Sequence, residues 1–560
     1  MGEEGGGRSC GTTRELQKLK QQAMEYYREN DVPRRLEELL NSTFYLQPAD
    51  VYGHLANCFS KLAKPPTICK VVGKNVLDGL GLPTLQVEIF CTVQNFPKNI
   101  CSVVISTPFK VHENALPELV EAEELERSDA VSTAVRWVNE TITKELQGLA
   151  PSNQAEVDQV LRTFFESKVQ EDKEGKGLEK SLEDSTVPTP SPLTPPLPPP
   201  PPAKKKGQKQ GRKDTLTKKP MIPPEPVEPI LCGSMAIGAV SLAVAKTSAV
   251  LGNNPLYLNI ALLKHHQDQP AKLTIPLLMV SLVSCGKSSP GKLNLMKEVI
   301  CVPRPGLTAK QGVDMLLEIQ KHINKTIEMS PPPKPETKKA HNGGNRGQSK
   351  GKYEVMMGTY KSAAEMVDLY VELINKFPSI IALIDPFRKE DSEQWDSTYN
   401  ALGSKCYIIA GTASKSISKL LEDGNIGSLR CSGLIVKHTN QTTMSDLVEM
   451  TNLIDSKKHI AVFGSAEGES SDDSLVDLAV GLGVRFIKLG GLSRGERVTK
   501  YNRLFTIEEE LVQNGTLGFN EEHTFSYLNE EAEKAAMAGE LPEPLEPIFA
   551  TEVVEESAKT

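Results

Sequence analysis

Residues 484–488 read VRFIK and residues 434–437 read LIVK, so each of these short apolar runs ends in a lysine. Runs of this length are typical of buried strands in a parallel sheet. In a parallel α/β barrel, the C-terminal ends of the strands form the reaction face. The two stretches therefore predict that Lys437 and Lys488 lie at one barrel mouth, where two amines could abstract a proton and hold an anion.

The same pattern repeats through the second half of the chain. Strand-like runs recur about 25 residues apart, at 379–385, 406–411, 432–437, 459–464 and 484–488. Helical patterns lie between them, at 361–376, 443–456 and 472–482. This alternation indicates a parallel sheet with crossover helices. Because each run ends at a polar residue, the pattern favours a barrel over an open sheet.

Composition limits the classes of function. The chain has 560 residues, of which 39% are hydrophobic, and a net charge of −8, which gives no general case for nucleic-acid binding. It lacks the 18-residue apolar run of a transmembrane helix and the apolar core of a secretory signal. The ten cysteines form no CxxC pair, as expected for free thiols in a reducing compartment. These features favour a cytoplasmic protein.

The N-terminal segment 13–64 is predicted to be helical. A polar helix covers 17–30, Pro33 opens a second and a third follows Pro48. The last two carry apolar residues at helical spacing, namely Leu36, Leu39, Leu40, Val51, Leu55 and Phe59. Two short amphipathic helices cannot bury their apolar faces alone, so they usually pair with a second copy. The alternative is a helical extension packed on its own chain.

Two polar segments interrupt the globular part. Residues 172–229 are low in complexity, with a proline run at 195–202 followed by lysine clusters, and residues 330–352 form a shorter break. We expect the first to be a disordered insert whose proline run favours the polyproline II conformation. The alternative is a docking stretch for a proline-reading module or an acidic surface.

Several motifs, in the right order, resemble the enolases (phosphopyruvate hydratases). They are 78–87 (DGLGLPTLQV), 236–246 with 255–257, 385–387 (DPF), 477–482 and 487–511, which begins IKLGGLSRGER. The resemblance covers roughly 67–150 and 231–525. Separately, the pattern over 32–56 is similar to the dimerisation and docking helices of cAMP-dependent kinase regulatory subunits and Dpy-30-like proteins.

The enolase resemblance implies a fold and a reaction. The fold is a small N-terminal α+β domain, 67–150 with 231–266, followed by an eight-stranded α/β barrel at 272–525. Beyond the resemblance, we expect 526–560 to form an acidic tail. Enolases are usually homodimers, and they dehydrate 2-phosphoglycerate to phosphoenolpyruvate. A lysine removes the C2 proton while Mg²⁺ stabilises the enolate.

Three residues of this sequence align with functional positions of the enolase site. Lys437 falls where the base lysine sits, Lys488 where a lysine binds the substrate carboxylate, and Glu298 where a carboxylate lies beside the leaving hydroxyl. Asp385 is a weak candidate for a metal ligand. Each of the first three could instead be a surface ion-pair residue.

The metal and phosphate positions depart from the family pattern. Ile384 stands where the family has a metal-binding glutamate, and Gly411 or Thr412 stands where it has the next metal-binding aspartate. The family's strand with the first metal-binding aspartate and its acidic glycine-rich loop should fall in 329–352, but neither pattern is visible there. Other family positions are also replaced, at Ser288, at 106–111 and at Ser465-Ala466-Glu467. Electrostatic stabilisation is usually the largest catalytic term, so these losses predict weak activity.

Two hypotheses therefore stand. One is an enolase-type lyase with Mg²⁺ and weak activity. The alternative is a non-catalytic enolase fold that dimerises through 13–64 and docks an amphipathic helix, in a cytoskeletal or ciliary assembly.

Overall fold

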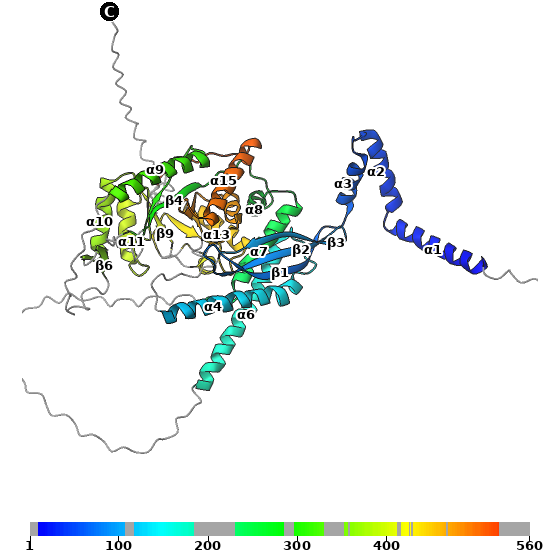
Figure 1. Cartoon of the computed structure of the whole chain (residues 1–560), viewed down its shortest axis with the longest axis horizontal. Helices are drawn as coiled ribbons and strands as arrows, with labels where there is room; N and C mark the ends of the chain where they lie inside the picture. The colour runs from blue at the N-terminus through cyan, green and yellow to red at the C-terminus, as the bar shows by residue number, and fades with distance from the viewer. Residues whose placement is uncertain are drawn as a thin grey trace, which may run out of the picture.

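The structure is a computed structural model (Figure 1). It describes residues 9–106, 117–183, 230–284, 296–329, 352–356, 359–411, 416–424, 426, 429–465 and 469–525. The proline run, the acidic tail and the break at 330–351 therefore lie outside the described residues.

Three N-terminal helices stand away from the body of the molecule (Figure 1). They are α1 (Ser9–Glu29), α2 (Val32–Leu46) and α3 (Val51–Leu62). Asp50 caps α3, because its Oδ1 accepts a hydrogen bond from the Gly53 amide at 2.8 Å. Helix α1 contacts α2, and α2 contacts α3. One hydrogen bond links α3 to the small domain, because Gln94 Nε2 donates to Ser60 Oγ at 3.1 Å.

The small domain is an antiparallel meander covered by helices. Its strands are β1 (Thr67–Leu77), β2 (Pro83–Val93) and β3 (Phe96–Val104). Its helices are α4 (Pro117–Arg136), the π-helical turn η1 (Trp137–Ile142), α5 (Thr143–Glu145), α6 (Gln154–Glu183), α7 (Met235–Leu251) and α8 (Leu256–Lys264). Because α6 runs to Glu183, the first residues of the insert predicted from 172 are helical.

The larger domain is built on a curled sheet. Its strands are β4 (Leu277–Ser284), β5 (Glu298–Cys301), β8 (Ala382–Ile384), β9 (Tyr407–Ala410), β10 (Gly433–Val436), β11 (Ile460–Gly464) and β12 (Phe486–Gly490). The order is β5-β4-β12-β11-β10-β9-β8, parallel except that β5 is antiparallel to β4. A separate hairpin pairs β6 (Tyr353–Met356) with β7 (Thr359–Lys361).

Helices surround this sheet (Figure 1). They are α9 (Ala309–Met329), α10 (Ala363–Lys376), α11 (Ser392–Leu402), α12 (Ile417–Asp423), α13 (Met444–Ser456), α14 (Ser474–Gly481) and α15 (Gly495–Gln513). An apolar cluster from inward-facing positions fills the interior: Leu277, Met279, Tyr407, Ile409, Val462 and Phe486. The α/β-barrel class predicted from the strand rhythm is confirmed.

The predicted count of eight strands is not met in the described residues. The sheet has seven strands there, and it ends at β5 on one side and β8 on the other. The chain between α9 and β6, which should supply the eighth strand, is the segment 330–351 outside the described residues.

No single helix of the described residues is both long and apolar enough to cross a membrane. The bent pair α7 and α8 together has the length and apolar composition of a membrane span, but most residues of α7 are buried in the core of the molecule.

Candidate active site

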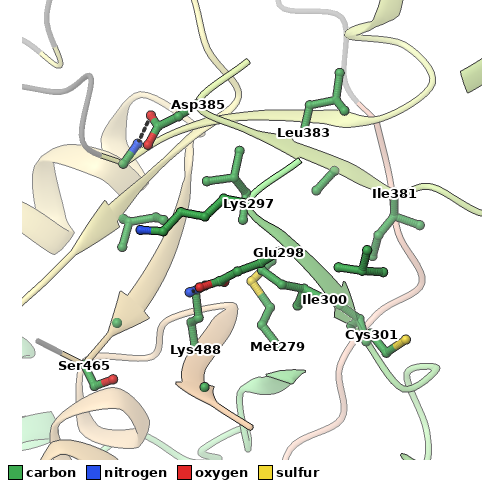
Figure 2. Close-up of a pocket in the computed structure, with 18 of the residues that line it drawn as sticks. Met279, Lys297, Glu298, Ile300, Cys301, Ile381, Leu383, Asp385, Ser465 and Lys488 are labelled. Carbon is green, nitrogen blue, oxygen red and sulfur yellow. Dashed lines mark hydrogen bonds and ion pairs between the residues drawn. The ribbon is translucent and has the colours of Figure 1, made fainter. Parts of the chain in front are cut away.

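One large cavity opens at the C-terminal ends of the barrel strands. Its volume is about 1840 Å³, and Lys437, Lys488, Glu298 and Asp385 all line it. Figure 2 shows side chains from β5, β8 and β12 converging on it. The structure therefore brings all four predicted site residues to one place, while their chemical roles stay predictions.

Lys488 and Glu298 form an ion pair across the cavity. Lys488 Nζ lies 2.8 Å from Glu298 Oε2, and the side chains are 24% and 26% exposed (Figure 2). Partly exposed pairs of this kind contribute little to stability, on the order of 1 kcal/mol or less. The pair matters for binding, because Glu298 holds the Lys488 amine that was predicted to bind a substrate carboxylate.

Lys437 follows β10 and extends past the end of β11. Its Cγ and Cε each lie 3.7 Å from the position that a Cβ on Gly464 would occupy. Both Gly464 and Lys437 line the cavity. The missing side chain at Gly464 therefore leaves room for the Lys437 side chain at the cavity wall.

The Asp385 carboxylate is used by the fold. It follows β8 with a left-handed φ of 48°, and its Oδ1 accepts a hydrogen bond from the Gly411 amide at 2.8 Å (Figure 2). Asp is one of the few residues that tolerate this conformation. The carboxylate thus ties together the ends of β8 and β9, which weakens its case as a metal ligand.

The residues present do not fit the magnesium ion that the enolase pattern implies. Across the described part of the chain, no group of three or more His, Cys, Asp or Glu side chains is placed to hold a metal. Ile384 and Gly411 line the cavity where the pattern expects carboxylates. Four other family positions, Thr412, Ser288, Ala466-Glu467 and 107–111, lie outside the described residues.

Sequence reasoning missed a second group of charges at the rim. Lys297, Arg494 and Arg497 line the same cavity. Arg497 Nε pairs with Glu469 Oε1 at 3.0 Å, and Lys500 Nζ lies 3.4 Å from Glu469 Oε2. Burial lowers the pKa of Lys500, and the carboxylate of Glu469 opposes that shift.

The sequence does contain a pattern that could have predicted these charged residues at the rim. The charged run SRGER at 493–497 directly follows the Lys488 strand, at the start of α15. Residues just after a barrel strand reach the mouth, so the run itself predicts cations there. Its partner Glu469 is buried, and the sequence alone gives no reason to pair them.

The fold and cavity define an α/β-barrel protein with charged side chains of both signs at its mouth. The family description "Enolase, C-terminal TIM barrel domain" matches residues 348–525. The chain is 74% identical to Enolase 4 of Homo sapiens over 620 aligned positions that cover 100% of this chain and 99% of the human protein. It is 65% identical to Enolase 4 of Mus musculus, with 100% of both chains covered. Cytosolic enolase 3 of Arabidopsis thaliana is 23% identical over 87% of this chain and 96% of its own length.

The chain belongs to the enolase family. The alignment with the human relative spans 620 positions whereas this chain has 560 residues, so at least 60 aligned positions have no counterpart here.

Proposed function

We propose that the barrel mouth binds 2-phosphoglycerate or a closely similar phosphorylated three-carbon acid, and that it dehydrates this acid only weakly. The observation that carries the proposal is the convergence of Lys437, Lys488 and Glu298 in one cavity. Lys297, Arg494 and Arg497 also line the cavity, where Arg497 pairs with Glu469 and Arg494 with Glu496, so a bound anion would compete with these two carboxylates for the arginines.

Each residue has a distinct role in this proposal. Lys437 Nζ accepts the proton from C2, and Lys488 leaves Glu298 to bind the carboxylate. Glu298, once released and protonated, gives its proton to the C3 hydroxyl, which departs as water. A neutral amine and a protonated carboxyl are needed at the same time, which is how acid and base roles divide between neighbouring groups.

Weak activity follows from the charge balance. Dehydration builds negative charge on the substrate carboxylate, and preorganised positive charge at that point is usually the largest catalytic contribution. The described residues offer lysines there and no set of carboxylates for a divalent ion. We therefore expect binding to be retained better than turnover.

Purified full-length protein tests the proposal. We expect the absorbance of phosphoenolpyruvate to rise slowly with 2-phosphoglycerate, and the rise to disappear in a Lys437→Ala variant. A Lys488→Ala variant should weaken substrate binding in calorimetry. A wild-type signal that does not exceed that of the Lys437→Ala variant would sink the lyase assignment.

A second candidate function rests on α2. Leu36, Leu40 and Phe44, spaced i, i+4 and i+8, are 39%, 57% and 70% exposed. This spacing places them on one face of the helix, and an unburied apolar stripe marks an interaction surface. We propose that it pairs with a second copy of the chain and that the resulting helix bundle docks an amphipathic partner helix in a cytoskeletal or ciliary assembly.

Light scattering on the full chain tests this scaffold role. We expect Leu40→Glu with Phe44→Glu to lower the oligomeric mass, and Lys61→Glu on α3 to leave it unchanged as a surface control. Removing residues 1–64 should also abolish partner retention in a pull-down. Equal mass and equal retention in all variants would contradict the scaffold function.

A further inference from the structure

Arg497 places a guanidinium group at the end of the strand that carries Lys488. It lies in the first turn of α15 and lines the cavity, with its side chain 23% exposed. Its Cζ is 2.7 Å from the position that a Cβ on Gly490 would occupy. Gly490 is the last residue of β12, two residues after Lys488. The absence of a side chain at Gly490 therefore gives the guanidinium its place at the barrel mouth.

The guanidinium of Arg497 keeps donors free for a ligand. Its Nε donates to Glu469 Oε1 at 3.0 Å. Among the described residues, the Arg497 side chain makes no other hydrogen bond or ion pair. Nη1 and Nη2 can therefore donate to an anion, and arginine binds carboxylates and phosphates through pairs of such N–H groups.

Glu469 is shared between Arg497 and a buried lysine. Lys500 is 1% exposed, and its Nζ lies 3.4 Å from Glu469 Oε2. The same ammonium donates to the carbonyl oxygens of Ser470 at 2.8 Å and Glu496 at 2.7 Å. A buried charge is costly unless it is paired and hydrogen-bonded, so these contacts hold each other in place. Lys500 thus fixes the backbone and carboxylate of 469–470 on α15.

The charges around Glu469 leave a positive excess. Glu469 faces two cations, Arg497 and Lys500. The neighbouring Arg494 pairs with Glu496. This cluster of three cations and two carboxylates therefore keeps one positive charge in excess. Because Lys500 also neutralises Glu469, an anion competes less for Arg497 than it would against a carboxylate that Arg497 held alone.

The same segment holds the small domain beside the mouth. The Glu469 carbonyl oxygen accepts from the Gly79 amide at 2.7 Å, and Ser470 Oγ donates to the Val104 carbonyl at 2.8 Å. Leu80, next to Gly79, lines the cavity. A shift of 469–470 would therefore move this loop of the small domain as well as the guanidinium.

We propose that Arg497 is a further ligand-binding residue of the barrel mouth and that Lys500 positions it through Glu469. The inference rests on the proposed function, because the ligand is the same phosphorylated acid. Arg497 Nη1 and Nη2 donate to anionic oxygens of that acid. Lys500 does not touch the ligand; it holds Glu469 so that the guanidinium stays at the cavity.

A double-mutant cycle in the full chain tests the proposal, with phosphoenolpyruvate as the calorimetric probe. Arg497→Met should weaken binding about tenfold or more, as expected for the loss of hydrogen bonds to a charged group. Lys500→Met should weaken it several-fold. Because Lys500 acts through Arg497, the double variant should bind no more weakly than Arg497→Met alone.

Lys264→Met is the matched control, because the Lys264 side chain is only 8% exposed. Its Nζ lies 2.7 Å from Asp455 Oδ2 and donates to the Leu482 carbonyl at 2.7 Å, and none of these residues lines the cavity. This variant should destabilise the fold, as Lys500→Met does, and leave the affinity for phosphoenolpyruvate unchanged. An equal loss of affinity in both variants would mean that destabilisation alone explains the effect, and it would overturn the positioning role.

Hydrogen exchange gives a measurement that needs no ligand. The Gly79 amide should exchange faster in Lys500→Met than in the wild type, and at the wild-type rate in Lys264→Met. Equal exchange in Lys500→Met and the wild type overturns the positioning role, as do additive losses of affinity in the cycle. Wild-type affinity in Arg497→Met overturns the ligand role of Arg497, whereas a wild type that does not bind phosphoenolpyruvate overturns the proposed function itself.

Discussion

Within the described residues, the two halves of the barrel differ in how their strands pair. From β9 to β12 each strand pairs on both sides, and β9 is buried throughout. On the other half, β5 and β8 are edges whose residues are all partly or fully exposed. Lys437 and Lys488 come from the complete half, after β10 and within β12. The positions where the family carries metal carboxylates lie on β8, at the end of β9 and in the segment 330–351 outside the described residues.

This difference explains why the family site is only half kept. The cationic side chains stand on strands that the core still holds in place. The carboxylate positions adjoin the β8 edge, where Ile384 and Gly411 replace acidic residues. The replaced carboxylate positions therefore gather at one side of the barrel, and the four predictions below test whether the two halves respond differently to substitution.

The largest effect is expected at Gly238, where α7 meets the complete half. A Cβ there would lie 2.5 Å from the Asn440 carbonyl oxygen and 2.9 Å from that of Thr442, both on the loop that follows Lys437. Backbone atoms cannot move away cheaply, so Gly238→Val should destabilise the protein by about 3 kcal/mol or more, the upper end for overpacking. Urea unfolding measures this change.

Gly495 at the start of α15 supplies the control for that experiment. A Cβ at Gly495 would meet nothing within 4 Å. Gly495→Ala should be neutral or slightly stabilising, because alanine is the better helix former. Similar unfolding midpoints for the two variants would show that the α7 contact does not hold the Lys437 loop.

The next effect concerns His438, which follows Lys437 on the same half. Burial lowers the pKa of His438 to about 4, while nearby backbone groups, Asp472 and Asp446 oppose the shift. The unfolded chain binds the proton more readily, so the stability is complete above pH 6.5 and is lost as pH falls towards 4. The loss should be about 3 kcal/mol.

To check this loss of stability, the unfolding free energies of wild type and His438→Gln are measured between about pH 7.5 and 4, the range in which histidine changes charge. The wild type should lose more stability than the variant as the pH falls. Parallel curves would mean that the complete half is not tight enough to keep this imidazole neutral.

Sequence patterns predicted the complete half well and the open half poorly. The runs at 432–437, 459–464 and 484–488 became strands within two residues of the expected ends because each buries an unbroken apolar stretch. The break at 330–352 shows no strand pattern in the sequence, and residues 330–351 lie outside the described part of the chain.

Long-range pairings were also beyond the sequence. Nothing local links Glu298 to Lys488, and only the fold places them 2.8 Å apart. The same holds for Phe525 against Tyr407 inside the barrel. The family resemblance locates the site residues in the sequence. Which carboxylate pairs with which lysine is decided by the three-dimensional fold.

A smaller effect is expected where the two halves meet, at the Lys488–Glu298 pair. Glu298→Gln removes a negative charge and frees the Lys488 amine, so phosphoenolpyruvate should bind several-fold tighter, equivalent to about 1 kcal/mol for a partly exposed pair. Calorimetry measures it. The gain should vanish when Lys488→Ala is added, and weaker binding by Glu298→Gln would show that Glu298 itself holds the ligand.

The smallest effect is expected at Asp385 on the open half. Asparagine keeps an oxygen that accepts from the Gly411 amide and tolerates the left-handed φ of 48°, so Asp385→Asn should change stability by less than about 1 kcal/mol. Asp385→Ala, which removes the acceptor, should cost more. If the carboxylate serves the fold and not a metal, calorimetric titration with Mg²⁺ should be the same for wild type and Asp385→Asn. A loss of Mg²⁺ binding in that variant would restore Asp385 as a ligand and show that the open half keeps part of the family's metal site.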